Sequence, residues 1–223
     1  MSKLFVVSTP IGNLGDISAR AIKTLKRVNF ILCEDTRRTQ KLLNHYDIKV
    51  KTISYHQHSK LAKVDYILKL LKDNDLAMVC DAGTPGISDP GNKLIEKIID
   101  TKEDIEIIPI PGASALTAIA SVAGFPMDRF LFLGFIPQKR KRAKFFEKIL
   151  KSEYSVVVYE SCHRILKTLN QLKELSSDLE IVVGRELTKK FETIYRGKID
   201  KVIQKLEKDK IKGEFVIVIK RND

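Results

Sequence analysis

The stretch Leu76-Ala77-Met78-Val79-Cys80, followed by Asp81-Ala82-Gly83-Thr84-Pro85-Gly86-Ile87-Ser88-Asp89-Pro90-Gly91, decides the fold of this 223-residue chain. Its first five residues predict a buried strand, and residues 91–99 predict a helix. The connection of eleven residues is long, because strand-to-helix connections usually have two to six. Glycines let a backbone approach a ligand closely, and the two carboxylates can balance a cation or bind hydroxyls. The loop is therefore predicted to bind a ligand.

The sequence on both sides of this loop alternates short apolar runs with amphipathic segments. Strands that alternate with helices pair in parallel, so the first half is predicted to be an α/β domain. Its expected strands are residues 4–7, 30–33, 51–55, 76–80 and 105–108, and its expected helices are residues 18–28, 39–46, 61–71 and 91–99.

A break at Pro109-Ile110-Pro111-Gly112 predicts a linker and two α/β domains of similar size, residues 1–112 and 113–223. The second half has less room for crossovers between its strands, so a mixed sheet is expected. Its expected strands are residues 130–136, 155–159, 180–183, 193–197 and 214–219, and its expected helices are residues 114–122, 140–151, 163–175 and 201–206.

The chain is strongly basic, with 40 Lys+Arg against 28 Asp+Glu and a net charge of +12. Residues 1–112 hold 17 basic and 14 acidic side chains, whereas residues 113–223 hold 23 and 14. This imbalance favours a polyanionic partner over a uniformly lysine-rich composition. The densest cluster predicts a phosphate-binding surface rather than a solvated helix face, and two arginines of the first half extend it. The predicted RNA-binding residues are Lys139, Arg140, Lys141, Arg142, Lys144, Arg37 and Arg38.

Other compositional features exclude several classes of protein. No apolar run approaches the roughly 20 residues that span a bilayer, and the polar start followed by a short apolar run indicates a first strand, not a signal peptide. The three cysteines are far apart, and the histidines lack ligand spacing with them, so neither a disulfide framework nor a metal site is expected. A cytoplasmic protein is predicted.

Three further loops at strand ends join residues 81–91 as candidate ligand-binding segments: residues 8–16, 111–115 and 159–164. The first of them lacks both the P-loop ending and the three-glycine dinucleotide fingerprint. A simple turn in which Asp16 or Ser18 caps the next helix explains it equally well.

Taken in order, the motifs resemble the ribosomal RNA small-subunit methyltransferase I family of the class III, tetrapyrrole-methylase-like methyltransferases. The resemblance covers nearly the whole chain. It is carried by residues 9–16, Glu34-Asp35-Thr36-Arg37, residues 81–91, Pro111-Gly112-Ala113-Ser114-Ala115, Gly134-Phe135-Ile136-Pro137, Tyr159-Glu160-Ser161-Cys162-His163-Arg164, Arg185-Glu186-Leu187-Thr188-Lys189 and Gly213-Glu214-Phe215-Val216.

The resemblance implies a tetrapyrrole-methylase-like fold with S-adenosylmethionine bound in a cleft between two α/β domains. It implies methylation of the ribose 2′-oxygen of a cytidine in the 16S rRNA of the small ribosomal subunit, and a homodimer. The cofactor neighbours that it implies are Asp81, Ala82, Gly83, Thr84, Ile87, Ser88, Asp89, Ala113, Ser114, Ala115, Tyr159, Glu160, Glu186, Leu187 and Thr188.

A ribose hydroxyl is a poor nucleophile until its proton leaves, so a base or a polarising cation should lie close to it. The candidates are Glu34, Asp35, Glu160, His163, Glu186 and Lys189, and the sequence does not choose among them. Two other functions stay open: methylation of an acidic tetrapyrrole precursor, and ribosome binding without catalysis. The basic cluster speaks against the first, and the loop of residues 81–91 against the second.

Overall fold

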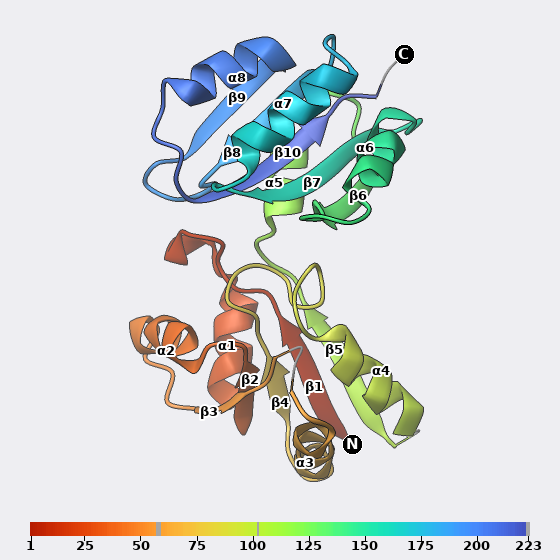
Figure 1. Cartoon of the computed structure of the whole chain (residues 1–223). Coiled ribbons are helices and arrows are strands. Elements are labelled where there is room, and N and C mark those ends of the chain that lie inside the picture. Colours follow the sequence, from red (N-terminus) through yellow and green to blue (C-terminus); the bar gives the residue numbers. More distant parts are fainter. Residues whose placement is uncertain (57–58, 102, 222–223) are drawn as a thin grey trace. The chain divides into compact units, whose positions relative to one another are not determined.

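The computed structural model describes residues 1–56, 59–101 and 103–221 (Figure 1). The chain divides into two compact units, Met1–Ser114 (unit 1) and Ala115–Asp223 (unit 2). In the described part of each unit, helices pack against a five-stranded sheet. The α/β fold class predicted from the sequence is therefore confirmed. No helix in the described ranges is long and apolar enough to cross a membrane.

Unit 1 is built on a sheet whose described strands all run parallel, in the order β3-β2-β4-β1-β5. Its strands are β1 (Ser2–Val7), β2 (Phe30–Cys33), β3 (Lys51–Ser54), β4 (Leu76–Met78) and β5 (Ile105–Ile110). Its helices are the 3-10 turn η1 (Leu14–Asp16), α1 (Ala19–Arg27), α2 (Thr36–His45), α3 (Leu61–Leu71) and α4 (Asn92–Thr101).

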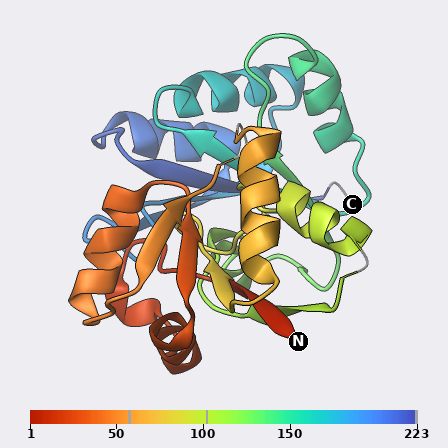
Figure 2. The same cartoon turned by 90° about the horizontal axis from the view of Figure 1, so that it is seen from below.

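The helices of unit 1 cover both faces of its sheet (Figure 2). Leu25 of α1 and Leu43 of α2 belong to one buried cluster, whereas Ile67 of α3 and Leu94 of α4 belong to another. The chain therefore leaves β1 toward one face, through α1, and leaves the neighbouring β4 toward the opposite face, through α4. Such a switch point opens a crevice at the carboxyl ends of the two strands, where open α/β sheets bind ligands.

Side-chain caps fix where two of these helices begin. The Ser18 hydroxyl accepts a hydrogen bond from the Ala21 amide at 3.1 Å, as an N-cap residue does. The Asp35 carboxylate accepts one from the Arg37 amide at 2.9 Å. Helix α2 therefore begins three residues before the predicted start, because the cap and not the first apolar residue sets the boundary.

Unit 2 contains a mixed sheet in the order β6-β7-β10-β8-β9, as predicted. Strands β6 and β7 are parallel, and the other described pairs are antiparallel. Its strands are β6 (Phe130–Phe135), β7 (Ser155–Ser161), β8 (Glu180–Arg185), β9 (Thr193–Lys198) and β10 (Glu214–Ile219). Its helices are α5 (Ala115–Ser121), α6 (Arg142–Leu150), α7 (Ile165–Leu175) and α8 (Ile199–Glu207).

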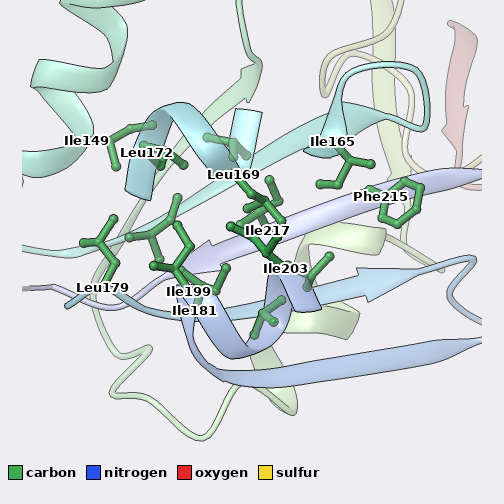
Figure 3. Close-up of a cluster of buried hydrophobic side chains, with 14 of the residues drawn as sticks. Ile149, Ile165, Leu169, Leu172, Leu179, Ile181, Ile199, Ile203, Phe215 and Ile217 are labelled. Carbon is green, nitrogen blue, oxygen red and sulfur yellow. The ribbon is translucent and has the colours of Figure 1, made fainter. Parts of the chain in front are cut away.

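The main core of unit 2 lies between one face of this sheet and helices α6, α7 and α8. Leu169 and Leu172 of α7 and Ile203 of α8 point at strand residues such as Ile181 and Ile217 (Figure 3). Helix α5 packs on the other face, where a Cβ at Gly184 would come within 2.8 Å of Ile119.

Candidate functional site

In unit 1, the loops after β1 and β4 meet at the carboxyl ends of these two strands. The Thr9 amide donates to the Gly83 carbonyl at 2.8 Å, and the Gly83 amide donates back to Thr9 at 3.1 Å. The Ser8 and Thr84 hydroxyls share a hydrogen bond at 2.9 Å, and Thr84 also reaches the Ala113 carbonyl at 3.4 Å. Three loops that are distant in sequence are thus tied together at one edge of the sheet.

Two glycines make this close approach possible. Gly83 has a φ of +86°, a left-handed conformation that side chains with a Cβ adopt only with strain. A Cβ at Gly112 would lie 2.9 Å from the Ser8 Cβ, closer than real Cβ contacts come. Gly112 therefore allows the β5 loop to lie against the end of β1.

A group of charged residues lies beside these loops, at the end of β2. The Asp81 carboxylate accepts a hydrogen bond from the Asp35 amide at 3.1 Å and pairs with the Arg38 guanidinium at 3.1 Å. Asp35 pairs with the Arg37 guanidinium at 2.9 Å. Arg37 and Arg38, the two arginines of unit 1 predicted to contact RNA, are thus bound to carboxylates of their own unit. Their side chains nevertheless stay 88% and 66% exposed, respectively.

The two neighbouring carboxylates at the end of β2 have opposite pKa shifts. Partial burial raises the pKa of Glu34, and the nearby Asp81 carboxylate adds to the rise, against the opposing effect of His56. Hydrogen bonds from Arg37 lower the pKa of Asp35 to about 2. A raised pKa brings a carboxylate closer to the value that a general base needs at neutral pH, whereas a lowered one makes it a weak base.

The rest of residues 81–91 offers both polar and apolar contacts. Burial raises the pKa of the Cys80 thiol, and the Asp89 carboxylate raises it further. Cys80 is therefore a neutral thiol that hydrogen-bonds the Ala82 and Gly83 carbonyls, not a nucleophile. Ile87 exposes 44% of its surface, and Ser88 next to it has a φ of +60°.

In unit 2, the second set of predicted residues lies where β7 and β8 end, on either side of the start of β10. In the register of the sheet, Phe215 faces Glu160 on one side and Arg185 on the other. The motifs of residues 159–164 and 185–189 therefore share one edge of the sheet, as their positions at strand ends imply.

Glu160, a predicted base and cofactor neighbour, is fully buried and holds several donors. One carboxylate oxygen accepts from the Thr168 hydroxyl at 2.7 Å. The other pairs with the Arg164 guanidinium at 2.7 Å and accepts from the Ser161 amide at 2.8 Å. The Thr168 hydroxyl in turn accepts from Arg142 at 2.7 Å. Glu160 is thus the centre of a buried network and has no exposed face from which to take a proton.

Glu186 and Lys189, two further candidate catalytic residues, bind each other at 2.7 Å. Burial acts to raise the pKa of Glu186, but hydrogen bonds from Lys189 and from the Glu214 amide outweigh it and lower that pKa. Burial acts to lower the pKa of Lys189, but Glu186 and Glu214 outweigh it and raise that pKa. Both residues therefore stay charged at neutral pH, which makes each a poor base.

The basic cluster of residues 139–144 is divided in the structure. Lys139, Arg140, Lys141 and Lys144 are exposed. Arg142 points inward instead: besides Thr168, its guanidinium donates to the Pro137 carbonyl at 3.0 Å and to Gln171 at 2.8 Å. The sequence pattern did not separate this one cation from the others, because the separation depends on the position of α7.

Several residues of the two sites were not assigned a role from the sequence. Arg164 and Glu214 lie inside the motifs of residues 159–164 and 213–216, so the family resemblance could have indicated them. Thr168 lies one helical turn after Arg164, a spacing that places both on the same face of α7. A Cβ at Gly213 would lie 2.2 Å from the Glu186 carboxyl, so this glycine leaves the space for that side chain. His163 is exposed.

No three His, Cys, Asp or Glu side chains come together as metal ligands within residues 1–56, 59–101 and 103–221.

Structural comparison shows the class of fold. The chain superposes on a cobalt precorrin-4 methyltransferase of cobalamin biosynthesis with a TM-score of 0.71 and 18% identity, covering 98% of this chain and 94% of that one. It superposes on a diphthine synthase with a TM-score of 0.76 and 13% identity, covering 99% and 90%.

Sequence comparison defines the class and then the family. Residues 3–203 match the Tetrapyrrole (Corrin/Porphyrin) Methylases. Relatives named ribosomal RNA small subunit methyltransferase I are 43% identical in Thermotoga maritima, over 98% of both chains, and 47% identical in Hydrogenobaculum sp., over 99% of this chain and 96% of the relative. The chain belongs to the ribosomal RNA small subunit methyltransferase I family of the tetrapyrrole methylases, as the motifs indicated. It is a methyltransferase whose methyl donor is S-adenosylmethionine.

The residues at the carboxyl ends of β1 and β4 fit this cofactor chemically. S-adenosylmethionine carries a cationic sulfur, an amino group and a ribose diol, which carboxylates and hydroxyls bind. Asp81 presents a partly exposed carboxylate there, and Thr84 a hydroxyl. The glycine at position 83 leaves room beside Ile11 and the Ala113 carbonyl that a larger side chain would fill. Asp81, Asp89 and Thr84 are the residues that we expect to hold the polar parts of the cofactor.

The Glu160 network has a testable energetic consequence. Thr168→Val keeps the shape of the side chain but removes the hydroxyl that joins Arg142 to Glu160. We expect a loss of about 1–3 kcal/mol in the free energy of unfolding, because a buried carboxylate oxygen loses its donor. Denaturant unfolding measures it, with the partly exposed Thr52→Val of β3 as the control. Equal stability of the two variants would contradict the network.

Proposed function

We propose that this chain transfers a methyl group from S-adenosylmethionine to the ribose 2′-oxygen of a cytidine in 16S rRNA of the small ribosomal subunit. The observation that carries the proposal is the loop of residues 81–91, which has two backbone hydrogen bonds to the β1 loop, a left-handed glycine and carboxylates at one sheet edge. The names of the full-length relatives and the exposed cations of residues 139–144 support RNA as the substrate.

We propose that the loops at the carboxyl ends of β1 and β4 in unit 1 bind the cofactor, and that the strand ends of unit 2 carry further cofactor-binding residues. The residues assigned to it are those that the family resemblance implied, with one change of role: Glu160 acts by holding Ser161 and Arg164 in place. We further propose that the protein works as a homodimer in the cytoplasm, where ribosomal subunits are assembled.

Glu34 is the residue that we propose as the general base. Asp35 is weakened as a base by its lowered pKa, Glu160 is enclosed by donors, and Glu186 is paired with Lys189. These exclusions leave Glu34 and His163. Glu34 is favoured because partial burial raises its pKa, and the Asp81 carboxylate of the proposed cofactor site adds to that rise.

The proposed roles divide the reaction among the residues of this chain. S-adenosylmethionine supplies a methyl group that is electrophilic because it is bound to a positively charged sulfur. Glu34 takes the proton from the 2′-hydroxyl, which makes the oxygen a nucleophile. The tied loops of unit 1 hold their side chains in one geometry, because most of the rate gain in such a displacement comes from alignment. The exposed cations of unit 2 hold the phosphates of the RNA.

A methylation assay tests the proposal directly. The protein is incubated with labelled S-adenosylmethionine and, separately, with small subunits, naked rRNA and an acidic tetrapyrrole precursor. We expect label in 16S rRNA, at a cytidine whose phosphodiester resists alkaline hydrolysis because its 2′-oxygen is blocked. Label in the tetrapyrrole alone would indicate a tetrapyrrole methyltransferase. No transfer of label to any substrate would favour a ribosome-binding protein without catalytic activity.

Gly83→Val tests the cofactor crevice. Its γ-carbons would enter the space beside Ile11 and Ala113, so we expect affinity for S-adenosylmethionine to fall by at least about tenfold. Gly124→Val is the matched control, because Gly124 also has a positive φ, +73°, but a Cβ there meets nothing within 4 Å. Calorimetry measures binding, and melting temperature checks the fold. If the Gly83 variant binds S-adenosylmethionine with normal affinity, the cofactor does not bind at this loop.

Glu34→Gln tests the base. A base must be deprotonated, so activity should fall as the pH drops through the pKa of Glu34, which is raised above its ordinary 4.5. We expect the variant to lose at least about 100-fold in kcat, the usual contribution of a general base, and to lose this acidic limb. Cofactor affinity should not change. If His163→Gln shows these effects instead, the base is His163.

Replacing Lys139, Arg140, Lys141 and Lys144 by Gln tests the RNA surface, with Arg142 kept because it is structural. The slope of log affinity against log salt should fall by about 0.7 for each lost contact with single-stranded RNA. The matched control replaces four lysines elsewhere in unit 2, Lys201, Lys205, Lys208 and Lys210, by Gln. Equal slopes in the two variants would show that the basic cluster affects RNA binding only through the net charge of the protein, not through specific phosphate contacts.

A further inference from the structure

Two phenylalanines of unit 2 without an assigned function, Phe132 and Phe135, form an aromatic cluster with Tyr159, which the family resemblance implies as a cofactor neighbour. The Phe132 and Tyr159 ring centroids are 5.0 Å apart, and those of Phe135 and Tyr159 are 5.4 Å apart, both in edge-to-face geometry. Phe135 is 56% exposed, which is high for a phenylalanine at the end of a strand. These three residues are called the aromatic cluster below.

An irregularity in β6 creates this cluster. In a regular strand, residues three positions apart, such as Phe132 and Phe135, would point to opposite faces of the sheet. Leu131 and Leu133 pack against the main core of unit 2, so Phe132 between them points to the other face. The pairing of β6 with β7 shifts register between Phe132 and Phe135, and Gly134 between them has a φ of +64°. This bulge brings Phe135 to the same side as Phe132 and against Tyr159. Bulges re-aim side chains in this way beside functional sites.

The backbone that follows Phe135 is held firmly by the buried Glu160 network. Arg164 donates to the Ile136 carbonyl at 2.9 Å, and Arg142 donates to the Pro137 carbonyl at 3.0 Å. The Ile136 amide donates to the Tyr159 carbonyl at 3.4 Å. An exposed ring on a fixed backbone loses little freedom when it binds a ligand, which favours affinity.

We propose that the aromatic cluster binds an unpaired nucleobase of the RNA substrate, which stacks on the ring of Phe135. Proteins recognise single-stranded RNA by stacking its bases on aromatic side chains and by placing cations along its phosphates. Both elements lie on one connection here, because exposed Lys139, Arg140 and Lys141 follow Phe135 within six residues. The adenine of the cofactor is a less suitable occupant, since S-adenosylmethionine has no phosphate for these cations to bind. The inference rests on the proposed function, because it assumes an RNA substrate.

A single tryptophan can report this stacking. The chain contains no tryptophan, so the variant Phe135→Trp carries the only one. We expect its fluorescence to be quenched by a single-stranded RNA oligonucleotide, because a stacked base quenches indole emission. An oligonucleotide of the same length that lacks the bases should bind the cations but not quench. Quenching by S-adenosylmethionine alone, without RNA, would assign the ring to the adenine and overturn the proposal.

An affinity measurement tests the same point without a probe. Phe135→Leu keeps an apolar side chain but removes the ring, and we expect RNA affinity to fall about 5- to 150-fold, the range for loss of one stacked base. Phe191→Leu is the matched control, since Phe191 is a 65% exposed phenylalanine of unit 2 outside the cluster. Affinity for S-adenosylmethionine should be the same in both variants. An equal loss of RNA affinity in both would overturn the proposal.

The two hypotheses fail in different ways. If the unaltered protein methylates small subunits while Phe135→Leu binds RNA normally, only the stacking proposal falls. If the unaltered protein methylates no RNA, the proposed function falls. The fluorescence of the Phe135→Trp variant, quenched only by RNA that carries bases, would then still decide whether the cluster stacks a base.

Discussion

The reciprocal hydrogen bonds between the backbones of Thr9 and Gly83 hold together two loops that the topology of unit 1 would otherwise separate. These loops leave neighbouring strands toward opposite faces of the sheet, so the helices that follow them pack in different layers. The hydroxyl contact of Ser8 with Thr84 adds a third connection. Without these bonds the eleven residues after Cys80 would have more freedom to move, and mobile loops lose entropy when they close around a ligand.

In unit 2, a buried network of charged side chains holds the loops at the strand ends in place. The buried Glu160 carboxylate would be strongly unfavourable alone, and Arg164 and Thr168 make its burial tolerable. The guanidinium groups that surround it also reach the Ile136 and Pro137 carbonyls, so one network fixes the ends of both β6 and β7. The residues that hold this site are therefore different from those that we propose contact the substrate.

The sequence predicted most of the fold because strands and helices depend on local periodicity. Each strand expected in unit 1 is present, and the start of α2 moved because of a single capping contact, whereas β5 continues to Ile110, into the predicted linker. The site was harder to predict for a different reason. Arg142 looks like its neighbours in a basic run, but Thr168 and Gln171 on α7 bind it from 26 and 29 residues away. Gly112 and Gly213 likewise matter because of side chains that are distant in sequence.

The same limit applies to the chemistry of the carboxylates. Glu34 and Asp35 are adjacent and chemically alike, yet the pKa of one is raised and that of the other is lowered. The difference arises because the N-cap position directs Asp35 to the Arg37 amide and guanidinium, whereas Glu34 is partly buried near Asp81. Glu186 is neutralised by Lys189 in a similar way. A carboxylate that must attract a proton cannot also be bound to a cation at short range. The ion pairs that hold most of the predicted carboxylates therefore weaken them as bases, and the one with a raised pKa, Glu34, is the one that we propose as the base.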